Sequence, residues 1–207
     1  MCRYLGKKGS QSFSLVDPYC INSTFPGAIV DRISMALPQH LDLEVTGNVN
    51  FIVFAGTNDS HSMSFNENNF YMSYKYLIDK VKTYSASSRI ICISLVPRCN
   101  ISKKYVNRSP PVYIINSNVL AINRAIRRLT TTYSPSNSVL YLDIYDMFRK
   151  HLDLNIGFLC SRTSFEYLRS GEVLWKRLFR PDGLHPSLEG NRLINEEIIR
   201  FIQYMVT

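Results

Sequence analysis

Three short apolar runs, separated by longer stretches with helical periodicity, constrain the fold more than any other feature of this sequence. The runs are rich in β-branched and aromatic residues and lie at 48–55, 89–96 and 139–143. Between them, apolar residues recur at helical spacing over 67–84 and 115–133. Strands that alternate with helices predict an α/β domain with a parallel sheet. The first two runs are continuous, which predicts strands that are buried on both faces.

Weaker helix signals lie on both sides of this pattern. A short helix is predicted from Ala28 to Leu37, where Pro38 closes it. Two more short helices are predicted over 146–152 and 172–179.

The last helix has the clearest start signal in the chain. Ser187 is a good N-cap, and an apolar stripe runs from there to Met205. Three other regions carry weaker secondary-structure signals. Residues 1–8 could be the end of a helix, 12–21 is a weak strand candidate, and 155–170 lacks clear periodicity. No repeat and no linker interrupts residues 1–207, so we expect a single domain.

The composition is that of a globular protein. The 207 residues are 45% hydrophobic and 19% charged, which is enough for one sizeable core. No apolar run reaches the roughly 18 residues that a membrane-spanning helix needs. The N-terminus carries charges with no apolar segment behind them, so it does not predict a secretory signal. We therefore expect an intracellular, cytoplasmic chain.

Nothing in the sequence indicates a cofactor. The five Cys lie at positions 2, 20, 92, 99 and 160 without a Cys-x-x-Cys pair, which argues against a disulfide framework or a zinc site. Cys92 lies in an apolar run and is interpreted as a small core residue. There is no P-loop, no Gly-x-Gly-x-x-Gly and no paired set of metal ligands, so we expect no nucleotide cofactor and no metal.

The formal net charge of +8 permits weak association with nucleic acid or with an anionic membrane surface. The densest basic group is Arg124, Arg127 and Arg128, which we expect on a solvated helix face. No zinc-finger, homeodomain or RNP-like sequence accompanies the charge.

The segment Pro181 to Ser187 carries the strongest catalytic signal. It places the Asp182 carboxylate three residues before the His185 imidazole, and Gly183 allows a tight turn between them. A carboxylate that accepts a hydrogen bond from one ring nitrogen fixes the tautomer and leaves the other nitrogen as a base. The competing interpretation of this segment alone is an ordinary surface turn.

Two further loops contain groups that could stabilise an oxyanion. Gly56-Thr-Asn-Asp follows the first apolar run, and an Asn58 amide can donate to a developing negative charge. Gly27, after Phe25 and Pro26, could offer a backbone N–H to the same oxyanion. Each signal is weak by itself, because Gly-x-Asn-Asp and Pro-Gly are also common turn sequences.

Together and in order, these three segments resemble the SGNH hydrolases, also called GDSL-type esterases. That family has four blocks: Gly-Asp-Ser with the nucleophile, a Gly, a Gly-x-Asn-Asp and an Asp-x-x-His. Gly27 matches the second block, Gly56 and Asn58 match the third, and Asp182 and His185 match the fourth. The resemblance covers nearly the whole chain. It implies a three-layer α/β/α, flavodoxin-like fold with the family's first strand in the middle of the sheet.

The departure from the family is that the 207 residues contain no Gly-Asp-Ser. The start of the chain is similar to the helix that follows this block in the family. We therefore expect a truncated chain, with the first strand and the nucleophile lying upstream, the alternative being a pseudoenzyme. No other hydroxyl or thiol is a convincing nucleophile; those considered are Cys2, Thr57, Ser60 and Ser187.

The resemblance implies acyl transfer on a small-molecule or lipid ester. His185 would be the general base, Asp182 would orient it, and Asn58 with the Gly27 N–H would form the oxyanion hole. Without its Ser the chain is expected to be inactive, and without a central strand it is expected to be poorly soluble.

The sequence is also similar to esterase domains of some retrotransposon-encoded proteins. Two alternatives stay open: a non-catalytic module of the same fold that binds nucleic acid or a membrane surface, and an α/β domain with chance motifs.

Overall fold

The computed structural model describes residues 27–40, 50–84, 88–98, 110–133, 138–152, 177–183 and 185–206. The predictions for 1–8, 12–21 and 155–170, and most of the helix predicted over 172–179, lie outside these residues.

The sheet is parallel, as the alternation of strands and helices predicted. Its described strands are β1 (Asn50–Val53), β2 (Arg89–Ile93) and β3 (Val139–Leu142), in the order β1-β2-β3. Ile90 is in register with Phe51 on one side and with Val139 on the other. Each parallel connection requires a crossover, which α2 (Glu67–Tyr84) and α3 (Val112–Thr132) provide. The predicted bounds of the α2 helix are confirmed at both ends.

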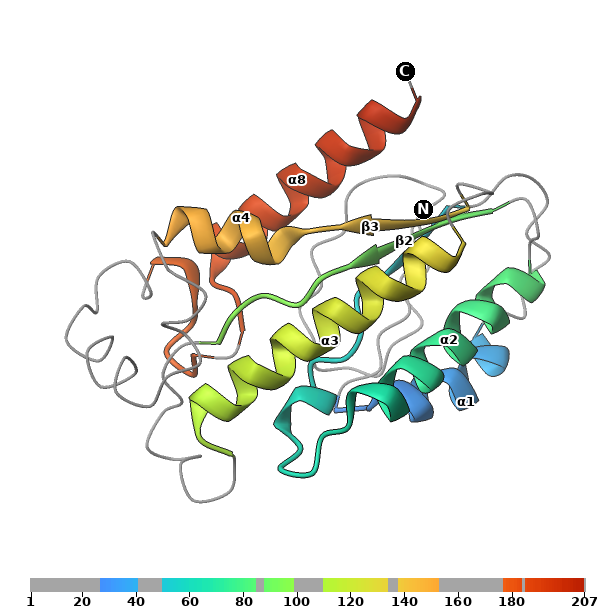
Figure 1. The fold of residues 1–207 in the computed structure, drawn as a ribbon. Coiled ribbons are helices and arrows are strands. Elements are labelled where there is room, and N and C mark those ends of the chain that lie inside the picture. Colours follow the sequence, from blue (N-terminus) through green and yellow to red (C-terminus); the bar gives the residue numbers. More distant parts are fainter. Residues whose placement is uncertain are drawn as a thin grey trace.

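The elements form three layers (Figure 1). Helices α2, α3 and α1 (Val30–His40) cover one face of the sheet, and α8 (Leu188–Val206) lies on the other. The short helix α4 (Ile144–His151) follows β3 directly. This arrangement confirms the predicted α/β class with helices on both sides of a parallel sheet. None of the described helices is long and apolar enough to cross a membrane.

The core lies between the sheet and helices α2 and α3. Strand β2 is its centre, since Ile90, Ile91 and Cys92 are fully buried, which confirms the interpretation of Cys92 as a core residue. The predicted stripe of α3 is buried as well, with Ile122 and Ile126 at 0% exposure. On the opposite layer, the stripe of α8 packs against the same core through Ile194, Ile198, Phe201 and Ile202.

The prediction that the first apolar run is buried on both faces is wrong. In β1, Phe51 and Val53 pack against the core, whereas Ile52 is 48% exposed and Phe54, just beyond the strand, is 46% exposed. These two side chains share a face, because alternate residues of a strand point the same way. An apolar run shows that a segment can be buried, but only the neighbouring layers decide how many faces are covered.

The prediction that Pro38 closes the first helix is also wrong, because α1 continues to His40. A proline inside a helix leaves the carbonyl four residues earlier without its usual N–H donor. Here that carbonyl belongs to Ser34, and the Lys80 ammonium of α2 donates to it at 3.0 Å. A contact between helices thus replaces the missing backbone hydrogen bond.

Candidate functional site

The Asp182–His185 segment forms the hydrogen bond that its sequence predicted. Asp182 Oδ2 lies 2.8 Å from His185 Nδ1, and Asp182 Oδ1 accepts from the backbone N–H of His185 at 2.9 Å. The two contacts fix the carboxylate against both the ring and the backbone of His185. The imidazole itself is exposed, so the ring nitrogen that does not face Asp182 is open to a substrate.

A small backbone ladder holds this segment in shape. The N–H of Arg180 donates to the carbonyl of His185, and the N–H of Ser187 donates to the carbonyl of Leu178, both at 2.8 Å. Gly183 turns the chain between them with φ +68°, a conformation that favours glycine. The Asp182–His185 pair therefore lies on a turn whose two flanks are hydrogen-bonded to each other.

The start of α8 anchors the same turn. The hydroxyl of Ser187 accepts from the N–H of Gly190 at 3.1 Å and donates to the carbonyl of Arg177, which confirms Ser187 as the helix cap. Gly190 packs against the backbone so closely that a Cβ there would lie 2.2 Å from the carbonyl oxygen of Leu178. No pattern in the sequence indicated this close approach of a helical glycine to the turn.

The Gly56 loop leaves the carboxyl end of β1 and meets the Gly27 turn. Gly56 has φ +113° and Gly27 has φ +73°, so both turns use backbone that favours glycine. The Asn58 side-chain amide donates to the carbonyl of Ala28 at 2.9 Å. The structure therefore brings together the two predicted oxyanion groups, Gly27 and Asn58, although they are 31 positions apart in the sequence.

Asp59 adds a second link between these two turns. Its Oδ2 accepts from the N–H of Val30, the first residue of α1, at 3.1 Å. Burial raises the pKa of the Asp59 carboxyl above its ordinary value, and hydrogen bonds to backbone N–H groups partly oppose the rise. The sequence motif contains this residue but gave it no role, because its partner lies 29 residues away.

Three asparagines of α3 hold the loops that follow β1 and β2. Asn118 donates to the carbonyls of Ser60 and Ser62, both at 2.9 Å, just beyond the Gly56 loop. Asn123 accepts from the N–H of Leu95 at 2.7 Å and donates to its carbonyl at 3.0 Å.

Asn116 makes the same two-way contact with the backbone of Arg98, at 2.7 and 3.0 Å. Asn116 and Asn123 are buried, as polar groups in a core can be when every bond is satisfied. Both asparagines lie beside the apolar stripe of α3, and a polar residue at such a position is the sequence signal that could have predicted a buried contact with the backbone.

The structure thus assembles the predicted residues as two pairs, Gly27 with Asn58 and Asp182 with His185. That both pairs surround one substrate stays a prediction. Among the described residues, no group of three or more His, Cys, Asp or Glu could hold a metal ion.

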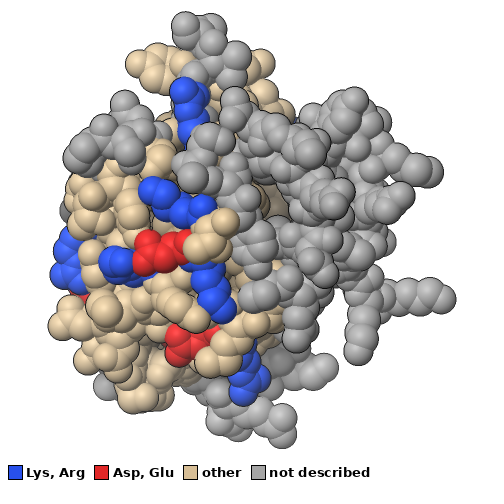
Figure 2. Space-filling view, turned by 90° about the vertical axis from the view of Figure 1, so that its right-hand side faces the viewer, with Lys and Arg blue, Asp and Glu red and all other residues tan. Residues whose placement is uncertain are grey.

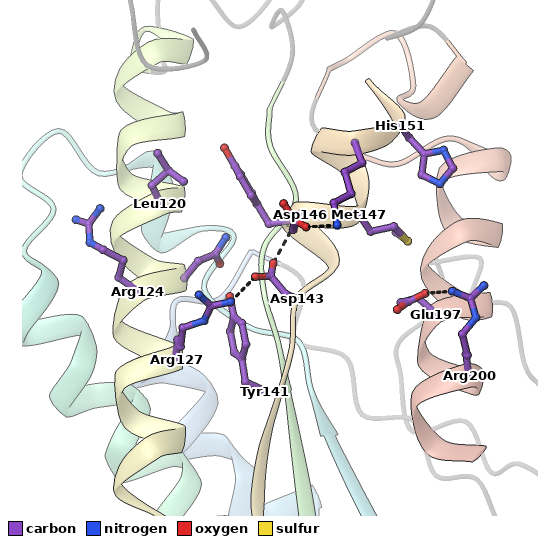
Figure 3. A pocket seen from close by; sticks show the side chains of 13 residues that line it. Leu120, Arg124, Arg127, Tyr141, Asp143, Asp146, Met147, His151, Glu197 and Arg200 are labelled. Carbon is purple, nitrogen blue, oxygen red and sulfur yellow. Dashed lines mark hydrogen bonds and ion pairs between the residues drawn. The ribbon is translucent and has the colours of Figure 1, made fainter. Parts of the chain in front are cut away.

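A surface groove of about 880 Å³ lies elsewhere, between α3, β3, α4 and α8. Figure 3 shows Arg127 and Asp143 directed toward each other at its sheet side, and Glu197 and Arg200 paired on α8. None of its described lining residues belongs to the Gly27, Gly56 or Asp182 segments. We place the candidate active site at the motif segments, because the Asp182–His185 contact lies there and not in this groove.

The three-layer α/β fold thus carries an Asp182–His185 contact on one turn and an Asn58–Ala28 contact between two others. The sequence pattern of the GDSL-like lipase/acylhydrolase family matches residues 31–198. The chain belongs to this family. No curated protein sequence shows significant similarity to it.

Solved structures show the same fold at low sequence identity. A GDSL-like lipase from Bacteroides thetaiotaomicron is 15% identical with a TM-score of 0.55, over 86% of this chain and 73% of its own. The acetyl xylan esterase AlAXEase is 16% identical with a TM-score of 0.56, over 88% and 80%. A Streptococcus pneumonia protein provisionally assigned as a platelet activating factor is 19% identical with a TM-score of 0.59, over 84% and 68%. At these identities the likeness supports the fold alone.

Proposed function

We propose that this protein is a carboxylic ester hydrolase domain that works by Ser-His-Asp acyl transfer. The observation that carries the proposal is the 2.8 Å contact between Asp182 Oδ2 and His185 Nδ1. Family membership supports the reaction class, since the pair lies in the family's Asp-x-x-His block.

His185 is the general base in this mechanism. With Nδ1–H donating to Asp182, Nε2 is left unprotonated and can accept the proton of an attacking Ser hydroxyl. The imidazolium that forms is stabilised by the adjacent carboxylate, and it later returns a proton to the leaving alcohol.

Asn58 and Gly27 stabilise the tetrahedral oxyanion. One N–H of the Asn58 amide is used by the carbonyl of Ala28, which orients the amide and leaves its second N–H for the substrate oxygen. The Gly27 backbone N–H is the second donor, and the Gly56 turn aims the loop. Each oxyanion donor is typically worth about 3–4 kcal/mol of barrier.

These 207 residues contain no Gly-Asp-Ser block, which carries the nucleophile in the family. The described hydroxyls near the motifs have other tasks: Ser187 caps α8, and Ser60 is buried and donates to the carbonyl of Thr57. We propose that the Ser lies in a segment upstream of this sequence and that the 207 residues alone hydrolyse esters slowly or not at all.

The proposal is tested by reading the natural transcript through the region upstream of the Met1 codon. An in-frame apolar strand that ends in Gly-Asp-Ser is expected. The product that includes this segment should hydrolyse short acyl esters, and its His185→Ala variant should lose roughly a 10³-fold or larger factor in kcat.

A stop codon or an unrelated sequence upstream would instead support the pseudoenzyme and would withdraw the esterase proposal for this protein. The 207-residue chain should be assayed in parallel, and appreciable turnover by it would show that another nucleophile exists.

We propose that the substrate is a small-molecule or lipid ester. We also propose that this chain is the esterase domain of a retrotransposon-encoded protein. Similarity of the Gly27 and Asp182 segments to such domains supports this source. An upstream reading frame without other retroelement domains would argue against it.

A further inference from the structure

The turn before α8 places an arginine directly opposite the candidate base. Phe179 and Pro186 form an antiparallel bridge, so the next pair toward the tip of the turn is Arg180 and His185. The Arg180 N–H donates to the carbonyl of His185 at 2.8 Å, as in a hydrogen-bonded antiparallel pair. Directly opposed residues project from the same side of the backbone, with Cβ atoms typically about 4.5–5.5 Å apart. The side chains of Arg180 and His185 are therefore neighbours.

Burial shows that these two side chains lie on the solvent side of the turn. Phe179 is 2% exposed, and its ring packs against that of Phe148 with 5.6 Å between centroids, so the other side of the bridge faces the core. Successive residues of an extended segment point to opposite sides, and Arg180 and His185 are both exposed. A ligand that reaches the imidazole from solvent therefore also reaches the guanidinium.

Several other exposed arginines of this protein are bound by carboxylates. Arg177, three positions before Arg180, pairs with Glu189 at 3.2 Å, and Arg200 pairs with Glu197 at 2.6 Å. Figure 2 likewise shows red Asp and Glu residues set among the blue Lys and Arg residues over the described part of one face. The charge of such an arginine is offset by the protein itself, which leaves it less available to a ligand.

The Arg180 side chain has no such partner in the part of the chain that the structure describes. No carboxylate there lies within ion-pair distance of its guanidinium, and its hydrogen bonds are made by the backbone. The carboxylate of the same turn, Asp182, contacts His185 through both of its oxygens. A guanidinium binds carboxylates and phosphates through two parallel hydrogen bonds. Arg180 is thus a charged group beside the base that an anionic ligand can use.

We propose, on the basis of the ester hydrolase function above, that Arg180 selects esters that carry an anionic group, a carboxylate or a phosphate, a few bonds from the ester carbonyl. His185 acts on the ester group while the guanidinium holds the anion beside it. An anion at this position also offsets the repulsion between the guanidinium and the imidazolium that forms during the reaction. Arg180 is therefore a specificity residue of the same site.

The test measures binding rather than turnover, so it does not require the nucleophile. Ligand-observed NMR titrations at low protein concentration give the Kd of two matched pairs of esters. One pair is monomethyl succinate and dimethyl succinate, and the other is 2-acetoxyethyl phosphate and 2-acetoxyethanol. The 207-residue chain should bind the anionic member of at least one pair about fivefold more tightly than the neutral member. The pair with the larger ratio identifies the anion as carboxylate or phosphate.

Arg180→Gln should abolish this preference and leave the affinity for the neutral member unchanged. The matched control is Arg177→Gln, which removes the same formal charge from a nearby arginine that is paired with Glu189. The control should keep the preference of the unchanged chain. A parallel loss of affinity for both members of a pair in Arg180→Gln would indicate a structural role for Arg180 and would overturn the proposal.

Three further outcomes would also overturn it. They are equal affinity of the unchanged chain for charged and neutral esters, an equal loss of preference in the two variants, and absence of binding by every ester. Failure of the proposed esterase function gives a different pattern. In that case a product that includes the upstream segment would bind the anionic ester with the expected preference but would not hydrolyse it.

Discussion

At the scale of single residues, two neighbouring side chains organise the turn that carries the candidate oxyanion hole. The Asn58 amide donates to the carbonyl of Ala28, and the Asp59 carboxylate accepts from the N–H of Val30. Two consecutive side chains therefore bind the backbone that joins Gly27 to α1. The Asn58 contact has an evident use in orienting the amide. The Asp59 contact is made by a carboxyl group whose burial opposes its ionisation.

Replacing Asp59 by Asn is expected to stabilise the fold at neutral pH by about 0.5–1 kcal/mol. The amide oxygen can still accept from Val30, and the desolvated charge is gone. The pKa of Asp59 is raised in the folded state, so the folded protein binds the proton more tightly than the unfolded chain. The stability contributed by this group is therefore present at low pH and is lost as pH rises through the raised pKa.

Urea unfolding at pH 7 and at pH 4 checks this prediction. The advantage of Asp59→Asn should be larger at pH 7 and should shrink at pH 4, where the native carboxyl is more protonated. Asp59→Ala removes the acceptor and should cost about 1 kcal/mol. An Asn variant that is less stable than the native protein at pH 7 would contradict the argument.

At the scale of elements, helices act here as holders of loops as well as covers of the sheet. Helix α3 binds the backbone beyond β1 and β2 through asparagine side chains, which satisfy backbone groups of the loops there. Helix α8 does the same for the Asp182–His185 turn through its cap and through the close approach at Gly190.

Gly190→Ala is expected to destabilise the protein by about 1–3 kcal/mol, although alanine favours helix by about 1 kcal/mol over glycine. The added Cβ would lie 2.2 Å from a backbone oxygen of Leu178, so α8 or the turn must move. Urea denaturation measures the loss, and the NMR chemical shifts of the His185 ring should change if the turn moves. Asn195→Ala, at an exposed position of the same helix, is the control and should stay within about 0.5 kcal/mol of the native value.

At the scale of the whole molecule, the described sheet is well covered at its centre and poorly covered at β1. Strand β2 is buried by both helical layers, whereas Ile52 and Phe54 present apolar surface on one face beside it. Neighbouring apolar side chains that are exposed on one face of a strand favour association between molecules.

The 207-residue chain is therefore expected to be poorly soluble by itself and to bind a hydrophobic dye. The double variant Ile52→Thr, Phe54→Thr places a β-branched residue at both positions and should lower both light scattering and dye binding, at a cost in stability of about 1 kcal/mol or less. A sharp, cooperative thermal transition of soluble monomeric native protein would contradict the expectation.

What could be predicted from the sequence was what neighbouring residues decide together. The alternation of strands and helices, the ends of α2, the Ser187 cap and the hydrogen bond of Asp182 to His185 all depend on spacings of a few residues. These signals survive because periodicity and short-range geometry act before any distant contact is made.

Only the tertiary structure decided the features that depend on what packs from far along the chain. The exposed face of β1 reflects which layers reach it, and the Ser34 carbonyl that Pro38 leaves without a backbone donor accepts from Lys80. The links of Asp59 to Val30 and of Asn123 to Leu95 likewise join residues at least 28 positions apart. A hydrogen bond or a covering side chain from such a distance leaves no periodic mark in the sequence, since its partner is chosen by the fold.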